Sequence, residues 1–572
     1  MKKVTEIFTL KMMKKIYNNK IKEYLNKNIP EITLIVLSIV MSGIYFYSHG
    51  NISTDTGREA IIPMALLNGQ VMYKDILNIY APLAYYLNAI LTAIFGIRLE
   101  SLYIGGIIST LISTIMLFKI SKKFFDINIS LWLTCFIAIT CFYNSSLFNY
   151  IMPYAYAVTY ALCFIFCSTY FLIEFLEKKE NKYLYLSALL SGCAFACKVE
   201  YIGIPLITLF VSLFLTKNKS TVFKTFATIC VIPFISYLFP FLQGMSINEG
   251  IEAFKIFLKE ATVPSMQTFT KVVGAVFTPA DIIIWIKGLI LFSIFIGIGY
   301  LLFKKAKRIV SYVITLFVLS IIHYISRGEI HFSAIAIVLV GYLIFNFKKL
   351  ISNKSLFILV LIALLSALKT FYNTDLSMYG VFTLPLLLIA AIAVIQKDYA
   401  EKIENKFKID FKGFIAFLLA AGTFSNFIYG INKKNFYSAP IETSRGRIET
   451  TEIWKDEAVK LLDFIKNNTN ENDKILFLPE GAMFNFLSNR STDMKMYVLD
   501  MPFIETLGEE KIEEGLSQYK YIAIIDGFGL YDFGMPRYYF KPNKITERIQ
   551  KDYGVIYINK TKETEVIFLE RK

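Results

Sequence analysis

The chain has 572 residues, of which 55% are hydrophobic and 18% charged, whereas soluble globular chains carry about 45–50% apolar and about 25% charged residues. This composition excludes an ordinary soluble protein. The formal net charge is +15, yet residues 431–572 hold 21 Lys and Arg against 23 Asp and Glu. The positive excess therefore lies in short segments between apolar runs, which is the pattern of cytoplasmic loops in membrane proteins and argues against nucleic acid as a partner.

Residues 1–30 form a basic, polar segment before the first apolar run, and we expect this segment to be a cytoplasmic N-terminus. A cleavable signal peptide has a short basic start and a small-residue exit, and this segment offers neither. The first apolar run is therefore predicted to be retained as a transmembrane helix.

Long apolar runs fill residues 31–430 and predict about thirteen transmembrane helices, each of which needs about 17–25 apolar residues. Lysine-rich loops alternate with loops poor in Lys and Arg, so the N-terminus is predicted to be cytoplasmic. An odd number of crossings then places the C-terminal segment outside, and the expected location is the plasma membrane. The predicted spans are residues 31–49, 99–118, 129–147, 154–176, 183–197, 201–216, 225–243, 281–303, 309–325, 332–347, 355–372, 380–396 and 414–430.

Residues 183–216 form one apolar stretch that only Lys198-Val199-Glu200 interrupts. As a single helix this stretch would be about 51 Å long, much more than a hydrocarbon core of about 30 Å. We therefore predict a hairpin of two short spans with Lys198 and Glu200 near its outer turn. The two residues are two positions apart, so they would not face each other on one helix.

Three predicted outer segments are long enough to carry a function. Residues 50–98 follow the first span, and residues 244–280 contain an amphipathic piece, EGIEAFKIFLKE, which suits a lid on the membrane surface. Residues 431–572 alternate predicted helices with short apolar strands. The expected fold is thus a polytopic α-helical membrane protein with a small C-terminal extracytoplasmic α/β domain.

The first outer segment carries Asp55, Arg58 and Glu59 directly after the first span. If a helix begins here, Asp55 pairs with Arg58 at i, i+3 and with Glu59 at i, i+4. Asp55 could equally be the N-cap of that helix. The spacing by itself therefore leaves open both an ion-paired surface helix and a functional carboxylate.

Further along this segment stand Gly69, Tyr73-Lys74-Asp75, Pro82, Tyr85, Tyr86 and Phe95-Gly96. Together with the Asp55-x-x-Arg58 pair, this pattern resembles the first outer loop of GT-C class glycosyltransferases. The resemblance is closest to the family 39 type, which includes bacterial relatives of protein O-mannosyltransferases and the lipid A aminoarabinose transferases. Thirteen spans and an outer C-terminal domain also resemble the aminoarabinose transferases.

The resemblance implies a polyprenyl-phosphate-linked sugar as donor, transfer with inversion and Asp55 as general base, with Arg58 matching the arginine three residues on. The aminoarabinose branch carries an acidic-Lys-Pro sequence just before its second span. Here the matching place reads Ile79-Tyr80-Ala81-Pro82, without the acid and the lysine. Asp75 stands in for the acid in relatives with a Y-x-D pattern, and the identity of the donor stays open.

Sugar transfer from a lipid phosphate needs few groups, because a polyprenyl phosphate is a good leaving group. Fixed cations must stabilise the departing phosphate, and a carboxylate must accept the proton of the acceptor hydroxyl. The candidate carboxylates are Asp55, Asp75 and Glu59. The candidates for binding the donor phosphate or the substrate are Arg58, Lys74, Tyr80, Lys198, Glu200, Arg327 and His331.

No spacing of the three histidines predicts a zinc site, and the sequence indicates no cofactor other than the donor itself. A requirement for a divalent metal stays open. The acceptor also stays open between a protein, a lipid and a glycan.

Two other functions fit a chain of this kind. A transporter or lipid flippase usually shows internal repeats and midplane charges, and neither is evident here. A glycan polymerase or ligase of the GT-C class usually has its large catalytic loop late in the chain, where this sequence has short loops. A glycosyltransferase that uses a lipid-phosphate donor is therefore the preferred hypothesis.

Overall fold

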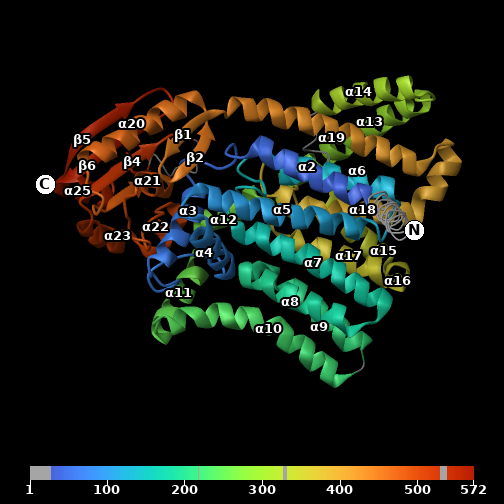
Figure 1. Cartoon of the computed structure of the whole chain (residues 1–572), viewed down its shortest axis with the longest axis horizontal. Coiled ribbons are helices and arrows are strands. Elements are labelled where there is room, and N and C mark those ends of the chain that lie inside the picture. Colours follow the sequence, from blue (N-terminus) through green and yellow to red (C-terminus); the bar gives the residue numbers. More distant parts are fainter. Residues whose placement is uncertain (1–27, 217, 326–331, 529–537) are drawn as a thin grey trace, which may run out of the picture.

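The computed structural model describes residues 28–216, 218–325, 332–528 and 538–572. Long helices run side by side through most of the molecule, and a smaller α/β domain built from the end of the chain covers one end of this bundle (Figure 1). The protein is therefore a multi-span helical membrane protein with a small C-terminal domain.

Each predicted span coincides with a helix of the bundle. These are α2 (Ile29–Tyr45), α5 (Leu99–Ser121), α6 (Ile127–Ile137) with the π-helical turn η1 (Ala138–Phe142), α7 (Tyr156–Lys178), α8 (Asn181–Cys197), α9 (Gly203–Leu215), α10 (Lys219–Leu242), α13 (Pro279–Lys305), α14 (Ile309–Ile325), α15 (Ile335–Phe345), α17 (Lys354–Ser366), α18 (Gly380–Phe407) and α19 (Phe411–Phe436). A short helix α16 (Phe347–Ser352) links α15 to α17. Within the described residues, six of these helices (α5, α7, α10, α13, α18 and α19) are long and apolar enough to cross a membrane by length and composition. The number thirteen stays a prediction.

The buried faces of the central helices carry large aromatic side chains, among them Tyr103, Phe142 and Phe166. The outer helices α13 and α14 instead expose rows of Ile, Leu, Val and Phe, and they lie at the edge of the bundle (Figure 1). An apolar surface of this kind suits lipid, because apolar side chains lose nothing there by staying exposed. The two kinds of face separate core helices from lipid-facing ones.

Helix α8 ends at Cys197, and Lys198 adopts an extended conformation with φ −154° and ψ 111°. A 3₁₀ turn, η2 (Val199–Ile202), follows and leads into α9, which packs against α8. The predicted hairpin at residues 183–216 is therefore present, with its charged residues at the turn.

Four shorter helices lie at the end of the bundle that carries the C-terminal domain (Figure 1). Helices α3 (Thr56–Leu67) and α4 (Leu83–Phe95) come from the first predicted outer segment. Helices α11 (Ile247–Glu260) and α12 (Pro264–Val272) come from the predicted lid. A capping box formed by Ser246 and Glu249 starts α11, and this accounts for a helix beginning directly after the Gly244 turn.

The C-terminal domain contains a four-stranded sheet in the order β3-β4-β6-β5, in which β3 and β4 are parallel and the other pairs antiparallel. Its elements are the hairpin β1 (Ala439–Thr443) and β2 (Gly446–Thr450), then α20 (Glu452–Asn468), β3 (Ile475–Leu478), α21 (Ala482–Ser488), α22 (Met501–Leu507), α23 (Glu509–Gly515), η5 (Leu516–Gln518), β4 (Tyr521–Asp526), α25 (Lys544–Asp552), β5 (Tyr553–Lys560) and β6 (Glu565–Arg571). Strands β3, β4, β5 and β6 agree with the short apolar strands predicted in the tail. The β1–β2 hairpin was not predicted.

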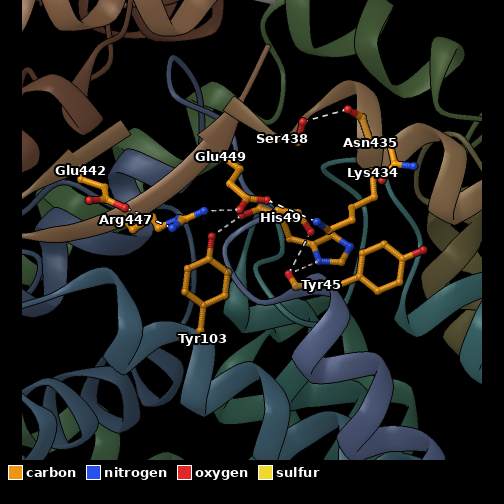
Figure 2. Close-up of polar contacts among 10 residues, drawn as sticks. Tyr45, His49, Tyr103, Lys434, Asn435, Ser438, Glu442, Arg447 and Glu449 are labelled. Carbon is orange, nitrogen blue, oxygen red and sulfur yellow. Dashed lines mark hydrogen bonds and ion pairs between the residues drawn. The ribbon is translucent and has the colours of Figure 1, made fainter. Parts of the chain in front are cut away.

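The β1–β2 hairpin joins the domain to the end of the first bundle helix (Figure 2). On β2, Glu449 pairs with Arg447 at 2.8 Å and faces Lys434 from the end of α19 at 3.8 Å. The backbone N–H of Glu449 also donates to the carbonyl of Tyr47. Close by, the Tyr103 hydroxyl donates to the carbonyl of His49 at 2.6 Å. The chain between α2 and α3 is therefore tied to both the bundle and the domain.

Candidate active site

A cavity of about 1230 Å³ lies where the helix bundle, the α11–α12 segment and the C-terminal domain meet. All three parts line it. Its apolar wall includes one face of α11, formed by Ile247, Ile251, Phe254 and Leu258, whose side chains are otherwise exposed. Its charged wall contains several of the predicted site residues.

Asp55 and Arg58 lie together at the start of α3. An Oδ of Asp55 accepts from a terminal nitrogen of Arg58 at 2.9 Å, and the Asp55 side chain keeps 25% of its surface exposed. Asp55 has φ +49° and ψ −55° and makes no side-chain cap hydrogen bond, so its side chain does not cap α3 and is paired with Arg58 instead. Burial raises the pKa of Asp55 above its ordinary value, although the Arg58 guanidinium opposes the shift.

Tyr80 lies between two cations. The Arg58 guanidinium carbon is 5.2 Å from the centre of the Tyr80 ring, and the Lys198 ammonium is 4.7 Å from it. Both distances allow cation–π attraction. Two positive charges therefore lie beside the same ring in the cavity wall, which favours binding of an anion there.

Lys198 and Glu200 form an ion pair at 3.0 Å, with the Lys198 side chain only 4% exposed and that of Glu200 55% exposed. The expectation that they would not face each other assumed a continuous helix. The extended conformation at Lys198 breaks the helix and turns the two side chains toward each other. Both residues line the cavity.

Lys369 is a cavity residue that the sequence analysis did not single out. It was placed inside the predicted span 355–372, but α17 ends at Ser366 and a 3₁₀ turn, η4 (Leu368–Thr370), carries Lys369 out of the helix. Its ammonium lies 4.0 Å from the centre of the Tyr379 ring. Burial lowers the pKa of Lys369 to about 7, and the nearby Lys198 contributes in the same direction. A lone lysine in an apolar run was the signal that could have identified it.

Three further carboxylates that line the cavity were also missed. Glu260 ends α11, Glu480 follows β3, and Asp500 caps α22. Burial raises the pKa of Glu260 and of Glu480 to about 8 and that of Asp500 to about 6. One carboxylate oxygen of Glu260 is buried without a hydrogen-bond partner. A buried polar atom without a partner destabilises the folded protein unless a ligand or water binds to it.

Glu59 is buried away from the cavity. Its carboxylate accepts from the Tyr85 hydroxyl at 2.8 Å, the Tyr156 backbone N–H at 3.0 Å and the Arg58 side chain at 3.2 Å. With three donors around it, Glu59 anchors α3 and orients Arg58. This geometry favours a structural role for Glu59.

Asp75 and Lys74 also do not line the cavity. An Oδ of Asp75 accepts from the Val71 backbone N–H at 2.9 Å, which closes the turn after α3. The Lys74 ammonium donates to the carbonyl of Gly244 at 3.1 Å, at the entry to α11.

The two remaining candidates, Arg327 and His331, lie outside the described residues. Across the part of the chain that the structure describes, no group of three or more His, Cys, Asp and Glu could hold a metal ion.

Comparison with known proteins links part of the chain to a family. The family model described as dolichyl-phosphate-mannose-protein mannosyltransferase matches residues 80–241, which is less than a third of the chain. A search of curated proteins gave no match.

Two solved structures resemble the fold over most of its length. The ArnT structure from Cupriavidus metallidurans bound to undecaprenyl phosphate is 8% identical, with a TM-score of 0.49, and the match covers 94% of this chain and 97% of that one. The archaeal oligosaccharyltransferase AglB from Archaeoglobus fulgidus, in complex with an inhibitory peptide and a dolichol-phosphate, is 12% identical, with a TM-score of 0.46, and the match covers 95% of this chain and 74% of that one. At this level of similarity no residue role is transferred from either structure.

The matched residues 80–241 include α4 to α10 and supply Tyr80, Lys198 and Glu200 to the cavity. The chain is therefore a multi-span helical membrane protein, and its residues 80–241 are similar to the dolichyl-phosphate-mannose-protein mannosyltransferase family.

Proposed function

We propose that this protein transfers a sugar from a polyprenyl-phosphate-linked donor to an acceptor hydroxyl. The single observation that carries the proposal is the meeting of Asp55 with three cations, Arg58, Lys198 and Lys369, around one cavity. A carboxylate base and a set of fixed cations are the two things that this reaction requires.

The donor phosphate would bind between Arg58, Lys198 and Lys369. Arg58 presents a planar guanidinium that suits phosphate oxygens, and the two lysines add point charges. The apolar face of α11, with Phe254 at its middle, would accept the start of the lipid chain. The cavity thereby offers a charged place for the headgroup next to an apolar place for the chain.

In the transfer step, Asp55 takes the proton of the acceptor hydroxyl while the acceptor oxygen forms a bond to the anomeric carbon of the sugar. The bond between that carbon and the phosphate oxygen breaks, and the electron pair leaves with the polyprenyl phosphate. The negative charge that develops on the phosphate is stabilised by the three cations. One displacement of this kind inverts the anomeric configuration.

A base works best when its pKa lies near the working pH. Burial raises the pKa of the Asp55 carboxyl above its ordinary value, and the Arg58 guanidinium opposes that shift. The proposed role for Arg58 is thus double, since it tunes the base and also faces the phosphate. The remaining candidates Asp75 and Glu59 have hydrogen-bond partners that make them less suitable as bases.

The alternation of lysine-rich loops supports a site on the outer face of the plasma membrane, with the C-terminal domain outside. There a lipid-borne donor and a water-borne acceptor can meet. The acceptor would be a protein, a lipid or a glycan of the cell envelope.

The proposal is tested by following release of free polyprenyl phosphate from a panel of polyprenyl-phosphate sugars by protein in lipid nanodiscs, with a cell-envelope extract as acceptor. Wild-type protein should release it, and Asp55→Asn should reduce the rate by about 10²–10⁴-fold, the usual contribution of a general base. Glu510→Gln, an exposed change on α23, is the matched control. Wild-type protein that releases nothing from any donor overturns the function, and an active Asp55→Asn variant of unchanged thermal stability overturns the base.

A further inference from the structure

The segment between α2 and α3, residues 46–55, is held by hydrogen bonds to the C-terminal domain along its whole length. The Tyr47 carbonyl accepts from the backbone N–H of Glu449. The Ser53 hydroxyl donates to the carbonyl of Phe528 at 2.8 Å. The backbone N–H of Asp55 donates to an Oε of Glu480 at 2.7 Å. Three separate places of the domain, more than 390 residues away in the sequence, therefore contact this one segment.

The contact continues into α3 as close packing. A Cβ built on Gly57 would lie 2.1 Å from the backbone nitrogen of Met483 in α21, so only glycine lets the two helices approach this closely. The apolar side of α21 is correspondingly buried, with Met483 and Phe484 fully inside. The start of α3 is thus pressed against the domain immediately after Asp55.

Asp55 itself has a backbone conformation that needs external support. Its φ of +49° is uncommon for a residue with a side chain, and such conformations persist only where the surroundings hold them. The hydrogen bond from its N–H to Glu480 is a direct constraint on that backbone. Without this bond, the segment would be free to relax toward an ordinary conformation and carry the Asp55 carboxyl away from Arg58.

We infer that Glu480 of the C-terminal domain is a positioning residue for Asp55, so that the domain completes the catalytic site rather than being attached to a site already complete. This inference rests on the proposed function, because it is tested through the rate of sugar transfer. Glu480 acts through the Asp55 backbone, and it does not need to touch the sugar or the phosphate.

The charged groups around Glu480 make the pH dependence of the transfer rate a second measurement of its role. The titratable and charged groups that face Glu480 are Asp55 and Arg58 from the start of α3, Asp500 at the start of α22, and Tyr497 from the segment before α22. Burial and the neighbouring Asp55 raise the pKa of Glu480 to about 8. Glu480 gains a negative charge beside Asp55 as the pH rises through about 8, so Glu480→Gln should remove the part of the pH–rate profile near pH 8 that this charge causes, which loss of a merely structural residue would not do.

The test compares Glu480→Ala and Glu480→Gln with Glu510→Gln in nanodiscs. Glu480→Ala should lower kcat by about 10- to 100-fold, the effect expected from misplacing a catalytic group by about 1 Å, with the affinity for donor unchanged. Glu480→Gln keeps an oxygen that can accept from the Asp55 N–H, so it should retain most of kcat but shift the pH–rate profile. Glu510→Gln should match wild type in both.

If Glu480→Ala fails to fold, Gly57→Ala gives an independent test, because it pushes α3 off α21 without altering any charge. It should lower kcat, while Lys198 and Lys369, which do not belong to α3, still bind the donor. Wild-type kcat and an unmoved pH profile in Glu480→Ala overturn the inference, as does wild-type kcat in Gly57→Ala. A wild-type protein without transfer activity would instead overturn the proposed function, so the two failures are distinguishable.

Discussion

The ammonium of Lys198 lies 3.0 Å from the carboxylate of Glu200, although only one residue separates them. The contact exists because α8 stops at Cys197 and the chain turns at Lys198. Lys198 is almost fully buried, whereas Glu200 is half exposed. A buried cation with one partly solvated partner keeps positive potential to offer a second anion, and Lys198 lines the cavity where that anion would bind.

Lys198→Ala should therefore weaken binding of the donor by about 10- to 100-fold, which corresponds to the range of about 1.5–3 kcal/mol for hydrogen bonds to charged groups. Glu200→Gln is the matched change, because it removes the partner and leaves the cation. Glu200→Gln should leave the affinity for the donor unchanged or raise it. Titration of the purified variants with a polyprenyl-phosphate sugar measures both, and equal affinities in the two variants would assign Lys198 to the turn alone.

Binding of the donor should depend on pH through Lys369. With a pKa lowered to about 7 by burial, Lys369 is charged below about pH 7 and becomes neutral as the pH rises. Affinity for a phosphodiester donor, which does not titrate in this range, should fall from about pH 6 to about pH 8. Lys369→Arg stays charged and should remove most of that dependence. An equally steep profile in Lys369→Arg would contradict this role.

Glu260 should make the protein less stable as the pH rises. Its pKa is raised to about 8 in the folded state, against about 4.3 in an unfolded chain, so folding binds a proton between these values. The stability contributed by this group is complete below about pH 4.3 and is lost as the pH rises through about 8. Glu260→Gln removes the titration, so its melting temperature should fall less than that of wild type between about pH 5 and about pH 8. Parallel melting curves would show that Glu260 does not titrate in that range.

The orientation in the membrane can be tested with single cysteines. Ser438 and Asn218 are both exposed, the first beside the C-terminal domain and the second between α9 and α10. In a background with Cys230, a partly exposed native cysteine, changed to Ser, Ser438→Cys should react with an impermeant thiol reagent on intact cells. Asn218→Cys should react only after lysis. The reverse pattern would place the C-terminal domain and the site in the cytoplasm.

The bundle helices follow directly from the sequence, because an apolar run in lipid must satisfy its backbone hydrogen bonds within the run itself. The break at residues 198–200 could be predicted for the same reason, since one helix of that length exceeds the bilayer. Asp55, Arg58, Tyr80, Lys198 and Glu200 were all candidates, and all five line one cavity. The strands of the tail were also evident, but their order in the sheet was not.

The sequence by itself therefore determined the positions of the helices and the charged residues at the end of the first span and at the turn after α8. It also predicted which end of the bundle faces the cytoplasm. Only the tertiary structure decided which of these residues share a site, and it added Lys369, Glu260, Glu480 and Asp500. Contacts such as that between Asp55 and Glu480 join positions 425 residues apart. They depend on how α3 packs against α21 and how the domain docks, and no local periodicity encodes that docking, because it arises from the shape of two surfaces that form only after each part has folded.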